Sequence, residues 1–493
     1  MEYRREAEPY ARTVALMLGM DATLLAAAIL AVTAGPPPAP APAETAAAEA
    51  PAAVVPAAPR KPARTLMGAI QVAHRSGAIA WAERVEHERD LVAANRAARR
   101  LPAARAAMIR DAVGVARAIA ADGRLNGERL EPVMKAVEAT THQARFLPMP
   151  AAGQRLRTRG DGIVYEYRPG AGVQPHPLAT AGRLNALARD CLHREEPGRC
   201  DEAGLRHGAD ALRRLGVRDR RALRFEYTYG FGTGAPLWTS AMAQATAAQA
   251  LARAGRVTGR REDARAATAA FRGIGALRMY SFKPGMRVLN GELQALIGIA
   301  DYARISGSRE ARRLVRREAP SLVRELGLWD TGAWTLYDAG GREATLHYHR
   351  LTATFAGEAC RRALARGLCP AARRYTRYTW QPPRLSLRVT RVTRAGRRVA
   401  VHAAASKSAT ATITVTGPPG FALHRHVTLA RSSSSVAFRA RRPGRYRVAM
   451  SAVAVNGKRA TASATVKAKP RPRRRAAARR RGADADKRSG RGR

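Results

Sequence analysis

The stretch YSFKPGMRVLNGELQALIGIADYARISG, residues 280–307, decides the fold class of this chain. An Asn-Gly turn, Asn290-Gly291, is expected just before a helix, because the surrounding apolar residues recur at helical spacing: Leu289, Leu293, Leu296, Ile297 and Ala300. A second stretch, WDTGAWTLYDAGGREATLHYHRL at residues 329–351, is expected to form an aromatic-rich loop and a short strand. The residue patterns of these two stretches are too specific for a generic helical repeat.

The surrounding sequence extends this prediction outward. Helical periodicity with short turns continues from His176 to about Tyr375, which predicts an α/α barrel (toroid) of helical hairpins. A β-hairpin is expected ahead of it at residues 156–168. After Pro382-Pro383 the period changes to two, which predicts a β-sandwich of immunoglobulin or fibronectin-III type. The expected fold class is therefore mainly α, with a C-terminal β-sandwich.

Two upstream segments complete a family resemblance. They are Phe225-Glu226-Tyr227 and APLWTSAMAQ at residues 235–244. With the two quoted stretches, over roughly residues 160–375, they resemble the C-terminal domain of D-glucuronyl C5-epimerases, which invert glucuronate to iduronate in heparan-type polysaccharides. The resemblance implies an exported bacterial isomerase that acts on uronate residues of an acidic polysaccharide without a cofactor or metal.

The same resemblance implies roles for individual residues. Inverting C5 requires removal of a proton next to a carboxylate and its return from the opposite face, hence two acid/base groups. Matched to the family motifs, these groups are Tyr337 and Tyr348. The resemblance also implies a substrate-binding cleft formed by Arg287, Asn290, Trp238, Gln244, Trp334, His349 and Tyr280. On general grounds, each tryptophan and His349 could equally be a buried structural residue.

One departure from the family pattern bears on activity. Family members place Glu-Glu-Tyr-Pro ahead of the Asn-Gly pair, whereas this chain has Arg278-Met279-Tyr280-Ser281, so only the tyrosine is retained. Glu292 could supply a carboxylate, although an acid in the first turn of a helix is also explained by the helix dipole. Two functions stay open: a uronate C5-epimerase, and an inactive polysaccharide-binding surface protein that retains an epimerase-like cleft.

The charge of the chain points to a polyanionic partner. The 493 residues include 87 Lys and Arg against 38 Asp and Glu, a net charge of +49. We expect an acidic polysaccharide as ligand, contact of the basic tail with an anionic cell envelope, and no specific nucleic acid. A homodimer is left open.

The N-terminus predicts export. Basic residues precede an apolar run that ends near Ala34, which is typical of a signal peptide or an uncleaved signal anchor, so the protein is expected at the cell surface, either membrane-anchored or secreted. The expected organisation is an export segment at 1–35, a Pro/Ala linker at 36–60, a helical region at 61–150, the epimerase-like α/α domain at 151–380, the β-sandwich at 384–469 and a disordered basic tail at 470–493.

Cysteine usage agrees with export. The four cysteines form two pairs of identical spacing, and local closure predicts disulfides between Cys191 and Cys200 and between Cys360 and Cys369. A zinc site is the weaker alternative, because eight intervening residues are not a zinc-knuckle spacing.

Overall fold

The computed structural model describes residues 65–157, 160–192, 200–431 and 434–471. These residues divide into two compact units. The first holds the described residues up to 329 together with 337–342 and 350–374, and the second holds 330–336, 343–349 and those from 375 onward. The predicted export segment, the linker and nearly all of the basic tail lie outside the described residues. Among the described helices, none is long and apolar enough to cross a membrane.

The first unit begins with four helices that have no counterpart in the family motifs. They are α3 (Leu66–Arg75), α4 (Trp81–Arg100), α5 (Ala103–Ala121) and α6 (Gly127–Phe146). Side-chain caps start two of them: Thr65 accepts from the amide of Gly68, and Asn126 from that of Arg129. Arg129 of α6 also forms two hydrogen bonds, of 2.7 and 2.9 Å, with the buried carboxylate of Glu226. This ion pair ties the N-terminal helices to the first family motif.

A three-stranded antiparallel sheet follows the four helices. Strands β1 (Arg155–Arg157) and β2 (Val164–Arg168) pair as the sequence predicts for a hairpin. The sequence analysis missed the third strand, β3 (Gly172–Pro175), which pairs with β2. Thr140 of α6 accepts from the amide of Val173 at 2.8 Å, so β3 is fastened to a helix as well as to the sheet.

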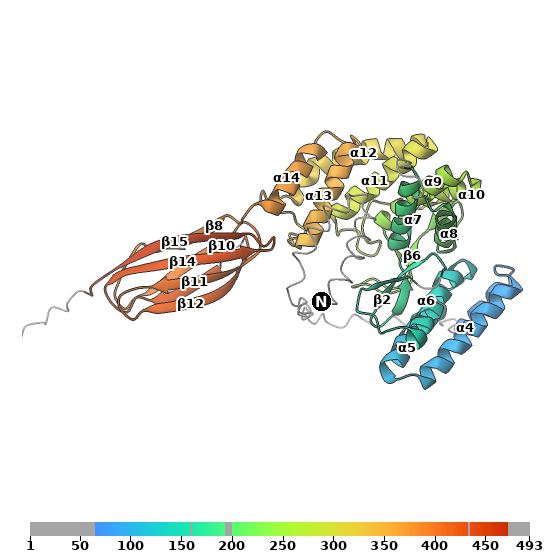
Figure 1. Ribbon diagram of the computed structural model, residues 1–493, viewed down its shortest axis with the longest axis horizontal. Coiled ribbons are helices and arrows are strands. Elements are labelled where there is room, and N and C mark those ends of the chain that lie inside the picture. The colour runs from blue at the N-terminus through green and yellow to red at the C-terminus, as the bar shows by residue number, and fades with distance from the viewer. Residues whose placement is uncertain (1–64, 158–159, 193–199, 432–433, 472–493) are drawn as a thin grey trace, which may run out of the picture. The chain divides into compact units, whose positions relative to one another are not determined.

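Helix pairs build the rest of the first unit (Figure 1). They are α7 (Pro177–Leu192) with α8 (Glu202–Arg214), α9 (Ala241–Thr258) with α10 (Arg261–Arg272), and α11 (Leu289–Ser306) with α12 (Arg309–Glu325). The first helices of the pairs pack against one another in the order α7, α9, α11. Short elements connect them: β4 (Val217–Asp219), β5 (Ala222–Arg224), β6 (Glu226–Tyr227), β7 (Trp238–Thr239) and the 3-10 helix η1 (Leu326–Leu328). Helices α13 (Leu346–Arg361) and α14 (Leu368–Trp380) each contribute residues to both units.

Side-chain size explains this layering. Helix α9 is alanine-rich and buried along most of its length, whereas α12 is arginine-rich and buries only Ala311, Val315, Ala319 and Leu322. Small residues let α11 approach α9 closely: a Cβ placed on Gly298 would lie 2.7 Å from the carbonyl oxygen of Ala245. These layers of paired helices form a helical domain.

The predicted Asn-Gly turn is wrong. Helix α11 begins at Leu289, so Asn290 and Gly291 lie inside its first turn. A Cβ on Gly291 would lie 2.9 Å from the sulfur of Met279. The glycine therefore allows a close approach of the Met279 side chain to the helix rather than a reversal of the chain.

The second unit is rich in β-structure. A three-stranded sheet has the order β13-β10-β8 and a five-stranded sheet the order β12-β11-β14-β15-β9, with β15 and β9 parallel. The strands are β8 (Leu385–Val389), β9 (Val392–Arg394), β10 (Arg398–Ala405), β11 (Ala409–Thr416), β12 (Ala422–Leu429), β13 (Ser434–Arg439), β14 (Gly444–Ala454) and β15 (Arg459–Lys469). Both sheets contribute to one apolar core. Figure 1 shows the long strands β11, β12, β14 and β15 side by side.

Candidate functional site

An aromatic cluster lies where the family motifs of the first unit meet. Its members are Tyr227, Tyr229, Trp238, Tyr280, Phe282 and Tyr337. The rings of Tyr227 and Trp238 are stacked, with centroids 3.9 Å apart, and the indole N–H of Trp238 donates to the carbonyl of Tyr229 at 2.9 Å. Trp238 is 7% exposed. It therefore forms a wall of the cluster, and its packing agrees with the structural alternative at least as well as with sugar contact.

Two tyrosine hydroxyls meet at the cluster. The Oη atoms of Tyr280 and Tyr337 are 3.3 Å apart. Tyr280 follows Met279 in the segment that leads into α11. Tyr337 is positioned by an isolated antiparallel β-bridge between Val288 and Asp338, the residue that follows it. Arg342 lies 4.7 Å from the centroid of the Tyr337 ring and pairs with Asp338 at 2.7 Å. Motifs that lie far apart in the sequence thus bring two phenols into contact.

The protonation state of these phenols follows from burial. Burial, then the hydrogen bond with Tyr280, raises the pKa of Tyr337 well above that of a free phenol, although the charge of Arg342 lowers it. Burial also raises the pKa of Tyr229 to about 12. Tyr337 is therefore protonated at neutral pH, which suits a proton donor.

The guanidinium of Arg287, a predicted substrate-binding group, is paired with two carboxylates. Its Nε and Nη2 atoms donate to Glu292 at 2.9 and 2.6 Å, and Nη1 donates to Glu325 at 2.6 Å. These carboxylates raise the pKa of Arg287 and neutralise its charge locally. The predicted substrate-binding role of Arg287 stays a prediction, and the carboxylate of Glu292 is engaged by the same pairing.

Gln244 and Asn290 are also buried, with 2% and 3% of their surface exposed. The side-chain amide of Gln244 donates to the carbonyls of Leu223 and Ala270, and its oxygen accepts from the amide of Phe225 at 3.0 Å. Gln244 therefore connects β5, α10 and the first family motif. These bonds make Gln244 part of the scaffold, and the predicted substrate contacts of Gln244 and Asn290 stay predictions.

A polar network that the sequence analysis missed borders the aromatic cluster. Glu166 of β2 lies within 3.2 Å of His176, and it also pairs with Arg168 (2.5 Å) and with Arg155 (3.7 Å). The guanidinium carbon of Arg168 lies 5.1 Å from the ring centroid of Tyr229. The signal in the sequence was the alternation in VYEYR, which placed charged residues on one side of the hairpin.

The protons of this network can be assigned. His176 Nδ1 accepts from the amide of Ala179 at 3.1 Å, so its Nε2 carries the proton and faces Glu166. Burial, followed by the charges of Arg155 and Arg168, lowers the pKa of His176 well below its usual value. Burial raises the pKa of Glu166, against the opposing effect of Arg168 and Arg155. A neutral imidazole, a carboxylate and a half-buried arginine thus stand beside the tyrosines.

The remaining predicted residues belong to the second unit. Trp334 and His349 have no exposed surface, and their rings are stacked 3.6 Å apart. His349 Nε2 donates to the carbonyl of Tyr375 at 3.0 Å, and Nδ1 contacts the hydroxyl of Thr335 at 2.8 Å. These contacts hold both rings in place inside the second unit, and the predicted substrate binding by Trp334 and His349 stays a prediction. Tyr348 is 39% exposed and lies in the second unit, so its predicted partnership with Tyr337 stays a prediction.

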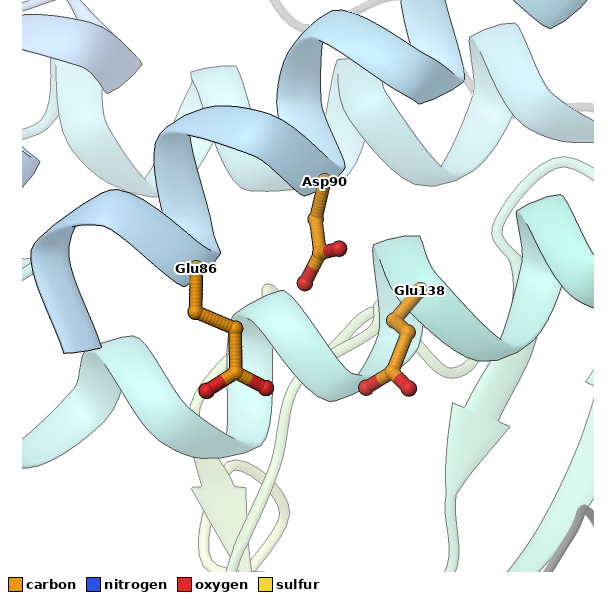
Figure 2. Close-up of side chains that lie close together, drawn as sticks. All are labelled: Glu86, Asp90 and Glu138. Atoms are coloured by element: carbon orange, nitrogen blue, oxygen red, sulfur yellow. The ribbon is translucent and has the colours of Figure 1, made fainter. Parts of the chain in front are cut away.

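Three carboxylates gather outside this site. Figure 2 shows Glu86 and Asp90 of α4 facing Glu138 of α6. Lys135 lies 2.7 Å from Glu138 and 3.9 Å from Glu86, and a cavity of about 210 Å³ adjoins Asp90 and Glu138. Lys135 is the cation that the structure pairs with this cluster.

Both predicted disulfides are present. Cys191 is bonded to Cys200 and Cys360 to Cys369, each across nine positions of sequence. The alternative of a zinc site is excluded for these four thiols, because each is committed to a disulfide. Such bonds are typical of proteins that fold in an oxidising compartment.

A comparison with known families covers part of the site. Residues 275–356 match the family model described as D-glucuronyl C5-epimerase C-terminus. The matched segment contains both tyrosines of the hydroxyl contact, Tyr280 and Tyr337, and also Tyr348. Through this segment, the chain is similar to the C-terminal part of D-glucuronyl C5-epimerases.

Proposed function

We propose that this protein is an exported uronate C5-epimerase that acts on an acidic polysaccharide. The observation that carries the proposal is the contact between the hydroxyls of Tyr280 and Tyr337 inside an aromatic cluster. A pair of phenols in contact can exchange a proton, and a protonated Tyr337 can deliver one to a carbanion at C5. We assign Tyr337 as the acid and place Tyr280 beside it, rather than only in the cleft wall.

Arg168 is the proposed partner of the uronate carboxylate. Its guanidinium lies over the rings of Tyr229 and Phe231, at 5.1 and 5.5 Å, and Phe231 is stacked with Tyr280 at 5.5 Å. A cation at this position would stabilise the negative charge that develops when C5 loses its proton. Tyr348 stays the proposed second acid/base group, and a homodimer and contact of the basic tail with the cell envelope stay proposals as well.

The second candidate function is that of an inactive polysaccharide-binding protein. Met279 stands where the resembling enzymes have a glutamate, and its thioether packs against the aromatic cluster. Without that carboxylate, the site has one fewer proton acceptor. The polymer would then be bound without inversion.

Proton exchange at C5 tests the proposal. A glucuronate polymer of heparosan type is incubated with the protein in deuterated water, and deuterium at C5 is followed by NMR. We expect wild-type protein to exchange this proton and Tyr337→Phe to lower the rate about 100-fold or more, the scale of a lost general acid. Polymer binding should change little, because only a hydroxyl is removed.

Tyr302→Phe is the matched control. This buried tyrosine of α11 donates to Thr268 at 3.3 Å and is not part of the aromatic cluster. Its exchange rate should stay near that of the wild type. Wild-type protein that binds the polymer but shows no exchange would contradict the catalytic proposal, and Met279→Glu would then test whether the missing carboxylate is the cause.

A further inference from the structure

The outer face of the five-stranded sheet carries a regular array of hydroxyl groups. The inward residues of β11 and β14 are apolar and belong to the core, so the alternate residues point outward. Together with β15, these outward positions supply eight hydroxyls: Thr410, Thr412, Thr414, Thr416, Ser451, Thr461, Ser463 and Thr465. We call this surface the hydroxyl face.

Strand register aligns these side chains in rows across the sheet. Thr412 is opposite His426 on one side and Ser451 on the other, and Ser451 is opposite Thr461. In the next row, Thr414 lies between His424 and Ala449, and Ala449 faces Ser463. The hydroxyls of Thr412 and Thr414 contact the Nδ1 atoms of His426 and His424 at 3.1 and 3.2 Å. These two rows therefore each end in a histidine at the edge strand β12.

A shallow groove runs over the middle of the hydroxyl face. Its volume is about 430 Å³, and its lining includes Thr412, Thr414, Arg447, Ser451, Thr461 and Ser463. Small residues make the groove, because Ala449 and Ser451 occupy outward positions of the central strand β14. Arg447 is exposed on the same strand. The groove thus offers several hydroxyls and one guanidinium to the same ligand.

The charge of this region is of one sign. Residues 384–471 contain 19 Lys and Arg residues and no Asp or Glu. Further exposed cations share the hydroxyl face with Arg447, among them Arg445, Arg459 and Lys467. A passive spacer needs only a soluble surface of mixed charge, whereas a uniformly basic face attracts polyanions.

We infer that the hydroxyl face binds an acidic polysaccharide. Hydroxyls of serine and threonine can donate to and accept from sugar hydroxyls, and guanidinium groups form paired hydrogen bonds with carboxylates. Single-stranded nucleic acid, by contrast, is bound on aromatic platforms, and the outward positions of β11, β14 and β15 hold no aromatic residue. The choice of a uronate polymer rests on the proposed function. The binding surface itself is separate from the aromatic cluster.

The test uses the full-length protein and heparosan-type oligosaccharides of one length, with affinity measured by calorimetry. Arg447→Ala/Arg459→Ala should weaken binding about tenfold or more, the scale of one or two charge-assisted hydrogen bonds. Thr461→Val/Ser463→Ala should also weaken binding, with an unchanged dependence on salt, because no charge is removed. Unchanged melting temperatures would show that all variants fold.

Arg388→Ala/Arg439→Ala is the matched control. Both arginines are exposed on the three-stranded sheet, so the same charge is removed from the other face. We expect its affinity to stay within about twofold of the wild type. Equal losses for the two arginine pairs, or equally tight binding of single-stranded DNA of the same charge, would overturn the inference.

C5 exchange measured on the same samples separates this inference from the proposed function. If wild-type protein shows no exchange but the groove variants lose affinity, the hydroxyl face is supported and the epimerase proposal fails. If exchange is present and the groove variants bind as tightly as the wild type, the hydroxyl-face inference fails and the epimerase proposal stands.

Discussion

Single residues show how burial sets chemistry in this protein. Lys407 is 1% exposed, and its ammonium donates to the carbonyls of Tyr378 and Gln381 at 2.9 and 3.0 Å. It also lies 4.8 Å from the ring centroid of Trp334. Burial, and then the charge of Arg384, lowers the pKa of Lys407 from 10.5 to about 8, although Glu343 raises it. At neutral pH the buried ammonium of Lys407 therefore destabilises the folded state relative to an exposed ammonium.

The pH dependence of stability tests this assignment. Between pH 8 and 10.5 the folded state binds fewer protons at Lys407 than the unfolded chain does, so its stability should rise with pH. The variant Lys407→Met has no amine to titrate at this position, so its stability should not rise with pH for this reason. Urea unfolding at pH 7.5, 9 and 10 measures the free energy of unfolding of both proteins. We expect the value for the wild type to rise relative to that of the variant by up to about 1.4 kcal/mol per pH unit. The exposed Lys467→Met is the control, and a wild-type-to-variant difference that stays constant over this range would refute the assignment.

At the scale of elements, the facing helices α4 and α6 carry carboxylates of like charge. Burial raises the pKa of Asp90 from 3.8 to about 6, and the charges of Glu138 and Glu86 add to the shift, against Lys135 and Arg89. A raised carboxyl pKa stabilises the folded state at low pH, and this contribution is lost as pH rises through 6. Near neutral pH, α4 and α6 therefore pack together despite the repulsion between their carboxylates.

Asp90→Asn should relieve that repulsion. We expect the free energy of unfolding to increase by on the order of 1 kcal/mol at pH 7 and by much less at pH 4, where the native carboxyl is already protonated. Denaturant melts at the two pH values measure the difference. Asp122→Asn, at the exposed end of α5, is the control. A loss of stability at pH 7 would show that Asp90 makes a favourable contact that outweighs the repulsion.

The helical elements also show which features a single sequence predicts. The apolar periodicity that predicts a helix around residue 290 is confirmed by α11, which ends at Ser306 with Gly307 in a left-handed conformation. The sequence analysis placed the start of α11 too late. An Asn-Gly pair favours a turn locally, but the packing of Met279 against Gly291 favours a helix. Tertiary contacts decided this boundary.

For the whole molecule, the family segment does not fall within one compact unit. Residues 330–336 and 343–349 group with the chain from 375 onward, rather than with the helical part as the predicted boundary at 380 implies. Ser408 donates from its amide and its hydroxyl to Glu343 at 2.7 and 2.6 Å, and Lys407 covers the ring of Trp334. Asn456 donates to three carbonyls near the end of α14, including that of Gln381 at 2.8 Å. The β-rich region therefore supports part of the epimerase-like segment.

Truncation tests this dependence. A chain that ends at residue 383 lacks Lys407, Ser408 and Asn456, so we expect residues 330–349 to lose amide protection in hydrogen-exchange mass spectrometry by about tenfold or more. A chain that lacks only residues 472–493 is the control and should keep its protection and melting temperature. Full protection in the shorter chain would show that the β-rich region is dispensable for this segment.

Local sequence is enough to predict the classes of element, the disulfide pairing and the family segment. Each depends on local information: apolar period, short loop closure, or a motif of neighbouring residues. The bonding partners of the motif residues, by contrast, depend on contacts between distant parts of the chain. Arg287, Gln244 and His349 carry suitable groups, yet the chain satisfies those groups internally. Tyr280 and Tyr337, 57 positions apart, gain a shared contact because long-range packing fixes distance, burial and proton affinity together.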